Sequence, residues 1–169
     1  DMKPGKRAEI LYSVARVLRE NIEMIARLES LQIGKPISDA RDEAALGARV
    51  FEYYAGAIGK FCGQTIPVSG GGFDFTLRQS MGVVAAIVPW NFPFPIACWK
   101  VAPALAAGNA VVLKPASLSP LTALVLAELA HRAGLPVGVL QVLPGPGSAM
   151  GDALVRHPRV RKVSFTGST

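Results

Sequence analysis

The chain begins with hydrophobic residues at helical spacing. Apolar residues recur every three or four positions along residues 6–31, with charged residues between them. This spacing predicts an amphipathic helix, which Gly34 and Pro36 would end. A second helix is expected from Ser38, its N-cap, to about Phe61, with acidic residues near its positive amino end. Its apolar face would comprise Leu46, Val50, Phe51, Tyr54 and Ile58.

The hydrophobic period changes to two between residues 62 and 80. Apolar and polar residues alternate on both sides of a turn at residues 69–72, and this pattern predicts a β-hairpin. Because a two-stranded hairpin is marginal alone, its apolar face requires a cover. The rest of this chain and a second subunit are both possible covers, and the pattern leaves the two alternatives open.

From residue 81 onward, short apolar runs alternate with longer helical patterns. Strands are expected at residues 82–88, 109–113, 139–143 and 162–166. Helices are expected at about residues 94–107, 119–132 and 148–156. This alternation requires right-handed parallel crossovers, so it predicts an α/β fold with a Rossmann-like parallel sheet and flanking helices. Three leucines of the second helix are expected in the core: Leu124, Leu126 and Leu129.

The composition is that of a globular α/β protein, with half of the 169 residues hydrophobic and 18% charged. The uncharged run 79–99 has the length of a membrane span, but Pro89, Pro93 and Pro95 would leave backbone groups unpaired in lipid. We therefore predict no membrane partner. The amino terminus lacks the apolar pattern of a signal peptide, so a cytoplasmic location is expected.

The distribution of basic residues and the positions of the two cysteines argue against nucleic-acid binding, a disulfide framework and a zinc site. The net charge of +6 is concentrated in part at residues 156–162, but no aromatic residues are interleaved with these cations, so we predict no nucleic-acid partner. Cys62 and Cys98 make neither a disulfide framework nor a zinc spacing. Neither cysteine has a neighbouring base, so both are interpreted as small hydrophobic side chains, and His131 and His157 as helix-end residues.

Three apolar runs end abruptly in small, polar or proline residues, at residues 87–95, 111–115 and 165–169. This is the pattern of buried strands that deliver loops at their carboxyl ends, where open α/β sheets bind ligands. These motifs resemble the NAD(P)-dependent aldehyde dehydrogenase superfamily, and the Pro-Trp-Asn-Phe-Pro run at residues 89–93 is among the more specific signatures of that superfamily. The resemblance covers most of residues 5–169.

The resemblance implies an incomplete aldehyde dehydrogenase fold, the amino-terminal, cofactor-binding part of such an enzyme. Residues 1–61 would be the N-terminal helices of the cofactor-binding domain, residues 62–80 an oligomerisation hairpin, and residues 81–169 a truncated NAD(P)-binding domain. A homodimer or homotetramer is implied for the full-length protein. Family members continue into a catalytic domain that supplies a nucleophilic cysteine and a general-base glutamate. Neither motif occurs in this sequence, so the chain alone is expected to be inactive.

By resemblance, the complete enzyme oxidises an aldehyde to a carboxylic acid through cysteine addition, hydride transfer to NAD+ or NADP+, and thioester hydrolysis. Asn91 is the expected catalytic residue, because a carboxamide at a strand end is an uncharged donor suited to a developing oxyanion. A CoA-acylating or acyl-phosphate-reducing member of the superfamily is one alternative. A non-catalytic nucleotide-binding or assembly module is another. Aliphatic, semialdehyde and amino-aldehyde substrates all remain open.

The resemblance assigns the cofactor to loops that follow the strands, with Lys114 on the ribose hydroxyls. The other implied cofactor-binding residues are Pro89, Trp90, Asn91, Pro115, Ala116, Ser117, Gly147, Gly151, Phe165, Thr166, Gly167 and Ser168. Phe92 and Trp99 match positions that line the aldehyde channel. Many NAD-preferring members carry a glutamate at the position of Ser117, which would repel a 2′-phosphate. We therefore hypothesise that NADP is accepted, and the choice between NADP and NAD as the preferred cofactor stays open.

Overall fold

The computed structural model describes residues 2–168, and its main element is a sheet of four parallel strands. The strand order is β5-β4-β3-β6, with β3 at Val83–Ile87, β4 at Ala110–Lys114, β5 at Leu140–Val142 and β6 at Val160–Phe165. Because all neighbouring strands are parallel, their carboxyl ends meet at one edge, called here the carboxyl edge. The predicted α/β fold is confirmed, with every strand within two residues of its expected bounds.

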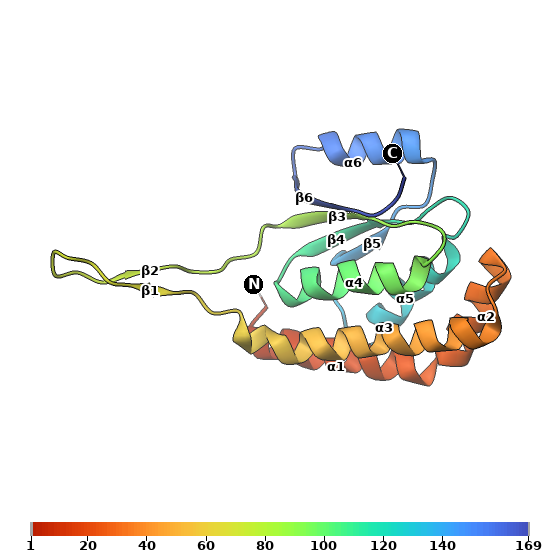
Figure 1. The fold of residues 1–169 in the computed structure, drawn as a ribbon, viewed down its shortest axis with the longest axis horizontal. Helices are drawn as coiled ribbons and strands as arrows, with labels where there is room; N and C mark the ends of the chain where they lie inside the picture. The colour runs from red at the N-terminus through yellow and green to blue at the C-terminus, as the bar shows by residue number, and fades with distance from the viewer. Residues whose placement is uncertain (1, 169) are drawn as a thin grey trace.

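Helices cover both faces of this sheet (Figure 1). On one face, α4 (Pro93–Ala106) joins β3 to β4 and α5 (Leu121–Arg132) joins β4 to β5. On the other face lie a π-helical turn, η2 (Gly147–Gly151), and α6 (Asp152–Arg156). The continuous helix expected over residues 148–156 is therefore wrong in form, since its first half is π-helical.

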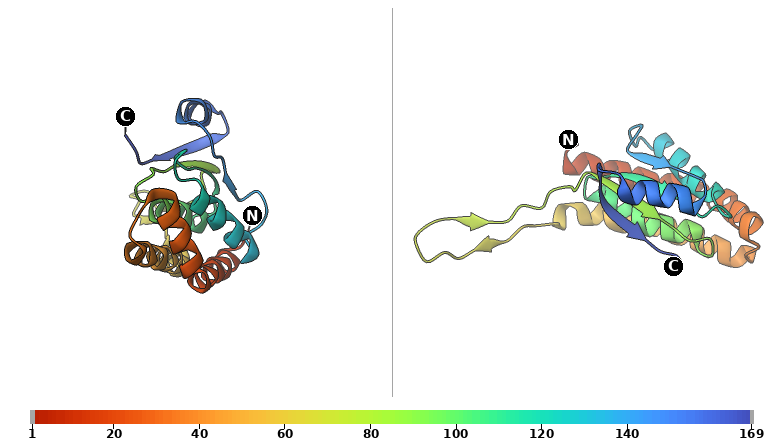
Figure 2. Two further views of the ribbon diagram at one scale, coloured as in Figure 1. Left: turned by 90° about the vertical axis from the view of Figure 1, so that its right-hand side faces the viewer. Right: turned by 90° about the horizontal axis from the view of Figure 1, so that it is seen from above.

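The amino-terminal helices form a further layer outside α4 and α5 (Figure 2). This layer holds α1 (Pro4–Glu20), α2 (Ile22–Ile33), α3 (Ile37–Ala57) and the 3₁₀ turn η1 (Ile58–Lys60). The single helix expected over residues 6–31 is wrong, because the chain leaves helical geometry at Asn21, whose side-chain amide donates to the Val17 carbonyl at 2.7 Å. The apolar spacing continues on both sides of that break, so periodicity alone does not reveal it.

The sequence predicted one residue that ends α2 and one residue that caps the start of α3, and the structure confirms only the first. Gly34 ends α2 in the left-handed conformation, at φ 73°, as the sequence predicts. Ser38 does not cap α3: Pro36 occupies the N-cap position and no side chain caps the helix. The Ser38 hydroxyl instead contacts the Asp39 carboxylate at 3.1 Å.

One hydrophobic core runs from the amino-terminal helices through α4 and α5 to the sheet. Its largest fully buried side chains include Leu11, Leu18, Ile25, Phe51, Phe94, Leu113, Leu126, Leu129 and Leu140. Leu124 is exposed, contrary to the expectation, because it lies on the outer side of α5. The core therefore joins the amino-terminal layer to the sheet that carries the candidate site.

The predicted hairpin is present and projects away from the body of the molecule (Figures 1 and 2). Its strands, β1 (Thr65–Ile66) and β2 (Asp74–Phe75), pair antiparallel over only two residues each. Its apolar side chains are exposed: Ile66, Val68, Phe73, Phe75 and Leu77. Within residues 2–168 nothing buries them, so the described residues do not supply the cover.

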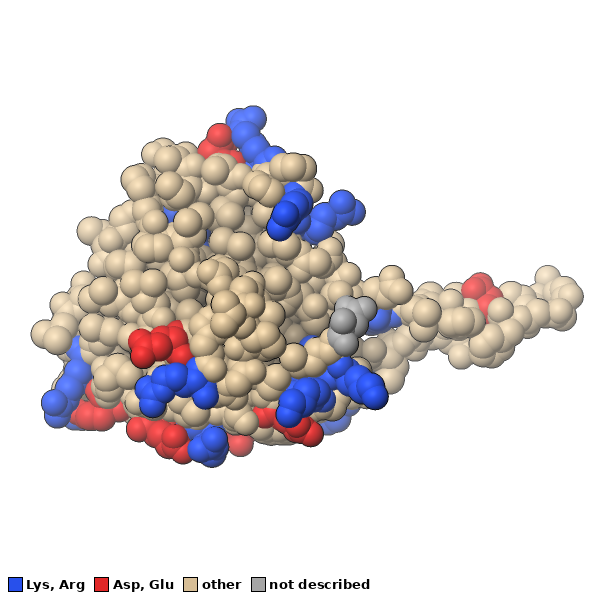
Figure 3. Space-filling view, turned by 180° about the vertical axis from the view of Figure 1, so that it is seen from behind, with Lys and Arg blue, Asp and Glu red and all other residues tan. Residues whose placement is uncertain are grey.

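Charges of both signs lie together along the amino-terminal helices (Figure 3). Ion pairs on this layer include Lys6–Glu9, Arg16–Glu20, Arg27–Glu23 and Arg41–Glu23. All are solvent-exposed, so they contribute little to stability. Over residues 2–168, no helix combines the length and apolar character needed to cross a bilayer.

Candidate functional site

The loops that follow the strands begin side by side at the carboxyl edge. Ile87 pairs with Lys114 in the β3–β4 register, and the Val88 amide donates to the Lys114 carbonyl at 3.1 Å. On the other side of β3, the Thr166 amide donates to the Ile87 carbonyl at 3.0 Å. The Leu143 amide, just beyond β5, donates to a β4 carbonyl at 2.8 Å. The sheet thus brings all four predicted site loops to one edge.

The loop after β3 carries Asn91 and is open to solvent. Val88 is buried and Pro89 is half-buried, whereas Trp90, Asn91 and Phe92 are exposed. Among residues 2–168, the Asn91 carboxamide has no hydrogen-bond partner, so its N–H groups are available to an external acceptor. Immediately after Phe92, the chain enters α4.

Lys114 ends β4 with a buried side chain, 4% exposed. Its ammonium donates to the Pro115 carbonyl at 2.8 Å, and burial lowers the pKa of the ammonium. No carboxylate within residues 2–168 forms an ion pair with it. The side chain turns back to the backbone of the next residue. Two of its three N–H donors remain for other acceptors.

The loops after β4 and β5 are joined by a hydrogen bond. The Ser117 hydroxyl donates to the Gly145 carbonyl at 3.0 Å. Gly145 is required there, since its φ is 150° and a Cβ would lie 2.9 Å from Met150 Cγ. A Cβ on Gly147 or Gly151 would meet open space. Pro115 is buried and Ala116 half-buried between these segments.

The last predicted segment follows β6. Phe165, Thr166, Gly167 and Ser168 are all exposed. A Cβ on Gly167 would lie 2.9 Å from Phe165 Cζ, so the aromatic ring packs directly on that glycine. Thr169 lies outside the described residues.

The two predicted channel residues flank different parts of α4. The Phe92 ring lies beneath the Lys35 ammonium, with Nζ 4.1 Å from the ring centroid. Trp99 is half-exposed and lines a shallow hollow of about 360 Å³ together with Leu46, Tyr53 and other residues of α3. The structure does not bring the two rings into one enclosed channel within the described residues.

Sequence reasoning missed several buried charges near this edge. Glu29 is 1% exposed and accepts from the Phe94 amide at 3.2 Å. Lys35 and Glu43 form an ion pair that is nearly buried. Lys100 donates to the Ser164 hydroxyl at 3.0 Å, and burial lowers the pKa of its ammonium. The sequence could have singled out Lys100, because it is the only charged residue between Arg78 and Lys114. No sequence pattern distinguishes Glu29 from the exposed charged residues of the amino-terminal helices.

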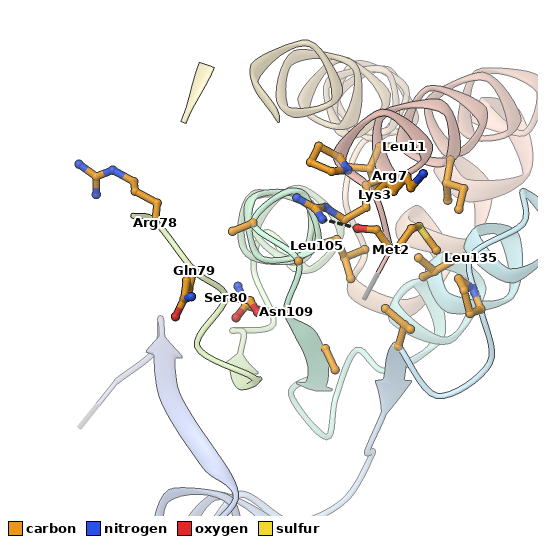
Figure 4. A pocket seen from close by; sticks show the side chains of 17 residues that line it. Met2, Lys3, Arg7, Leu11, Arg78, Gln79, Ser80, Leu105, Asn109 and Leu135 are labelled. Carbon is orange, nitrogen blue, oxygen red and sulfur yellow. Dashed lines mark hydrogen bonds between the residues drawn. The ribbon is translucent and has the colours of Figure 1, made fainter. Parts of the chain in front are cut away.

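A separate cavity lies at the opposite edge of the sheet (Figure 4). It measures about 760 Å³ and is lined by Ser80, Asn109, Val139 and residues of α1. Arg7, at its wall, donates to the Met2 carbonyl at 2.7 Å. None of the predicted site residues lines this cavity. The predicted site residues after β3 and β4 lie at the carboxyl edge instead.

The cysteines and histidines differ in their surroundings. Cys98 is fully buried, and this burial raises the pKa of its thiol, so it is a small core residue as expected. Cys62 is exposed, so the same interpretation is wrong for it. His131 Nδ1 lies 3.1 Å from the Leu135 carbonyl, just past the end of α5, and His157 is exposed at the end of α6.

Comparison with known proteins gives one consistent result. The sequence profile of the aldehyde dehydrogenase family matches residues 1–169. A Bacillus subtilis protein named as a candidate aldehyde dehydrogenase, DhaS, is 46% identical over 99% of this chain. The aldehyde dehydrogenase KauB of Pseudomonas aeruginosa (46% identity, TM-score 0.96) and PnpE in complex with nicotinamide adenine dinucleotide (43% identity, TM-score 0.95) match 99% and 98% of this chain. The chain spans 34% of each of these three proteins.

Proposed function

This chain belongs to the aldehyde dehydrogenase family, and from that premise we propose that its carboxyl edge binds NAD+ or NADP+ in an enzyme that oxidises an aldehyde to a carboxylic acid. The observation that carries the proposal is the pairing of the Asn91 loop with Lys114 across β3 and β4. A similar protein supports the same proposal, since PnpE was solved in complex with nicotinamide adenine dinucleotide.

The donor set at this edge fits a dinucleotide. The Lys114 ammonium is buried beside a single carbonyl acceptor, and burying a cation without partners is costly. Ribose hydroxyl oxygens are neutral acceptors that would satisfy its remaining N–H groups. Ser168, Thr166 and Gly167 offer small exposed positions beyond β6 for the pyrophosphate. When bound, the nicotinamide supplies a hydride acceptor.

Asn91 is the proposed oxyanion donor. Its carboxamide is exposed and has no partner among residues 2–168, so it can donate to an aldehyde oxygen as negative charge develops there. The nucleophile is proposed to be a cysteine outside this sequence, with a glutamate as general base. Cys98 is unsuited, because burial raises the pKa of its thiol and disfavours the thiolate.

NADP is the proposed preferred cofactor. Ser117 is uncharged and exposed beside Gly145, so no carboxylate at this position repels a 2′-phosphate. Replacing Ser117 with Glu is expected to lower kcat/KM for NADP+ more than for NAD+. A wild-type protein that strongly prefers NAD+ would contradict this assignment.

The exposed hairpin is proposed as an arm that packs on a second copy of the protein. Its five exposed apolar side chains have no cover within residues 2–168, and such a surface is typical of subunit contacts. A homodimer or homotetramer is therefore expected for the complete protein.

The test assays the complete protein with propanal, succinic semialdehyde and an amino-aldehyde. The rate of NADPH or NADH formation is measured for each substrate. Asn91→Ala is expected to lower kcat by about 10²-fold to 10³-fold, as for loss of one oxyanion donor. Lys114→Met is expected to raise KM for the cofactor with a smaller change in kcat. Wild-type kinetics in both variants would refute the site. The 169-residue chain alone is expected to be inactive, and turnover by it would contradict an external nucleophile.

A further inference from the structure

The first turn of α4 has an unusual hydrogen-bonding need. A helix leaves the N–H groups of its first turn without partners inside the helix. In α4 these residues are Pro93, Phe94 and Pro95, and proline has no N–H. Phe94 therefore carries the single donor of these three positions. The Glu29 carboxylate of α2 accepts it, at 3.2 Å.

Glu29 belongs to a buried polar network that also reaches α5. Gln32 donates to the Glu29 carboxylate at 2.9 Å and to the Thr122 hydroxyl at 2.8 Å. The side-chain carbonyl oxygen of Gln32 accepts a hydrogen bond from the backbone amide of Leu121, the first residue of α5, at 3.0 Å. Burial raises the pKa of the Glu29 carboxyl, while hydrogen bonds from Thr122, the Phe94 amide and Gln32 oppose that rise. One segment of α2 thus binds the amino ends of both helices that follow the site loops.

Lys35 adds a contact on the other side of the same loop. Its ammonium lies over the Phe92 ring, 4.1 Å from the centroid, and pairs with Glu43 of α3. The Lys35 and Glu43 side chains are only 10% and 11% exposed. A cation held over a ring in such a desolvated position interacts more strongly than at an exposed one.

We propose that Glu29, Gln32 and Lys35, together called the anchor, position the Asn91 loop and the Lys114 loop for the proposed reaction. Asn91 lies between two fixed points: the Val88 amide bound to the Lys114 carbonyl, and the Phe92–Phe94 segment bound to Lys35 and Glu29. Only Pro89 and Trp90 separate Asn91 from the first point. The anchor residues act through this loop, so they are positioning residues. The catalytic part of this inference rests on the proposed function.

Releasing the anchor has a calculable consequence. A displacement of about 1 Å at a reacting group can cost about 10²-fold in rate. The Asn91 carboxamide depends on the loop for its placement, so Glu29→Ala is expected to lower kcat by about 10-fold to 10²-fold. The KM for NADP+ is expected to change less than that, because Lys114 keeps its strand position in the β3–β4 register.

The first measurement is hydrogen exchange of the complete protein, which needs no activity. A peptide over residues 92–96 has only Phe94 and Ile96 as interior exchanging amides, since residues 93 and 95 are proline. Glu29→Ala is expected to speed exchange of this peptide at least several-fold, and Glu29→Gln, which keeps an acceptor oxygen, much less. Glu23→Ala is the matched control, because Glu23 is an exposed residue of the same helix. Equal exchange in wild type and Glu29→Ala would overturn the anchor.

The second measurement is a double-mutant cycle with Asn91→Ala. If Glu29 acts through the Asn91 carboxamide, Glu29→Ala costs much less in kcat when that carboxamide is absent. An equal loss in both backgrounds would mean a merely structural role and would overturn the proposal. Should Glu29→Ala fail to fold, Lys35→Met serves in its place, with exposed Lys60→Met as control. A wild-type protein without dehydrogenase activity would refute the proposed function, and the exchange result would still decide the anchor.

Discussion

Gly47 offers a sharp test of how α3 and α4 pack. A Cβ at this position would lie 2.5 Å from Phe94 Cε1 and 2.9 Å from Cys98 Sγ. Non-bonded carbon atoms prefer about 3.5–4.0 Å, so Gly47→Ala creates an overlap of about 1 Å. Both neighbours are fully buried, so neither ring nor sulfur has free space into which to move.

Two opposing effects set the magnitude. Alanine gains about 1 kcal/mol over glycine inside a helix, whereas overpacking a core costs about 1–3 kcal/mol or more. With two rigidly held neighbours, we expect a net loss of about 1–2 kcal/mol. For a domain of this size, that lowers the thermal midpoint by about 2–8 °C.

The assay is thermal denaturation, with Gly5→Ala as the matched control. Gly5 lies in α1 and a Cβ there meets nothing within 4 Å, so this change should leave the midpoint unchanged or raise it. Phe94→Leu shortens the side chain that the added methyl group would strike, so Gly47→Ala should cost less in a Phe94→Leu background. A Gly47→Ala protein as stable as wild type would refute the packing.

Three further outcomes are expected. Thiol alkylation followed by mass spectrometry should modify exposed Cys62 readily and leave Cys98 unmodified in the folded protein, since burial raises the pKa of the Cys98 thiol; rapid modification of both would contradict the burial. Because burial raises the folded-state pKa of Glu29, its protonated form stabilises the fold at low pH and this contribution is lost as pH rises through the folded pKa. The melting temperature of Glu29→Gln minus that of wild type should therefore increase as pH rises from about 4, and a flat difference would count against it. Replacing Phe73 and Leu77 with Ser should weaken self-association of the complete protein in analytical ultracentrifugation, whereas unchanged association would exclude the hairpin as the contact.

Much of the fold could be predicted from the sequence because its signals are local. Alternating apolar runs and helical patterns gave the parallel sheet, and the turn at residues 69–72 gave the hairpin. The break between α1 and α2 at Asn21 was not predicted, because the helical spacing of apolar residues continues across it. The failed Ser38 cap shows that a favourable residue near a helix start does not cap it when proline sets the entry.

Some features of the candidate site could likewise be predicted from the sequence, and others could not. Strand ends place Asn91 and Lys114 at one edge, so sequence patterns suffice for them. Glu29 contacts the Phe94 amide across 65 positions of sequence, and no periodicity links the two. Whether Lys114 turns outward or inward depends on packing around its side chain, which only coordinates reveal.

The central claim is that a nicotinamide dinucleotide lies along the carboxyl edge. Its most direct test is a crystal structure of the complete protein grown with NADP+. The account predicts electron density for the ribose within hydrogen-bond distance of Lys114 Nζ and for the nicotinamide beside the Asn91 loop. Density for the dinucleotide in the cavity near Arg7 and Asn109, at the opposite edge, would contradict it.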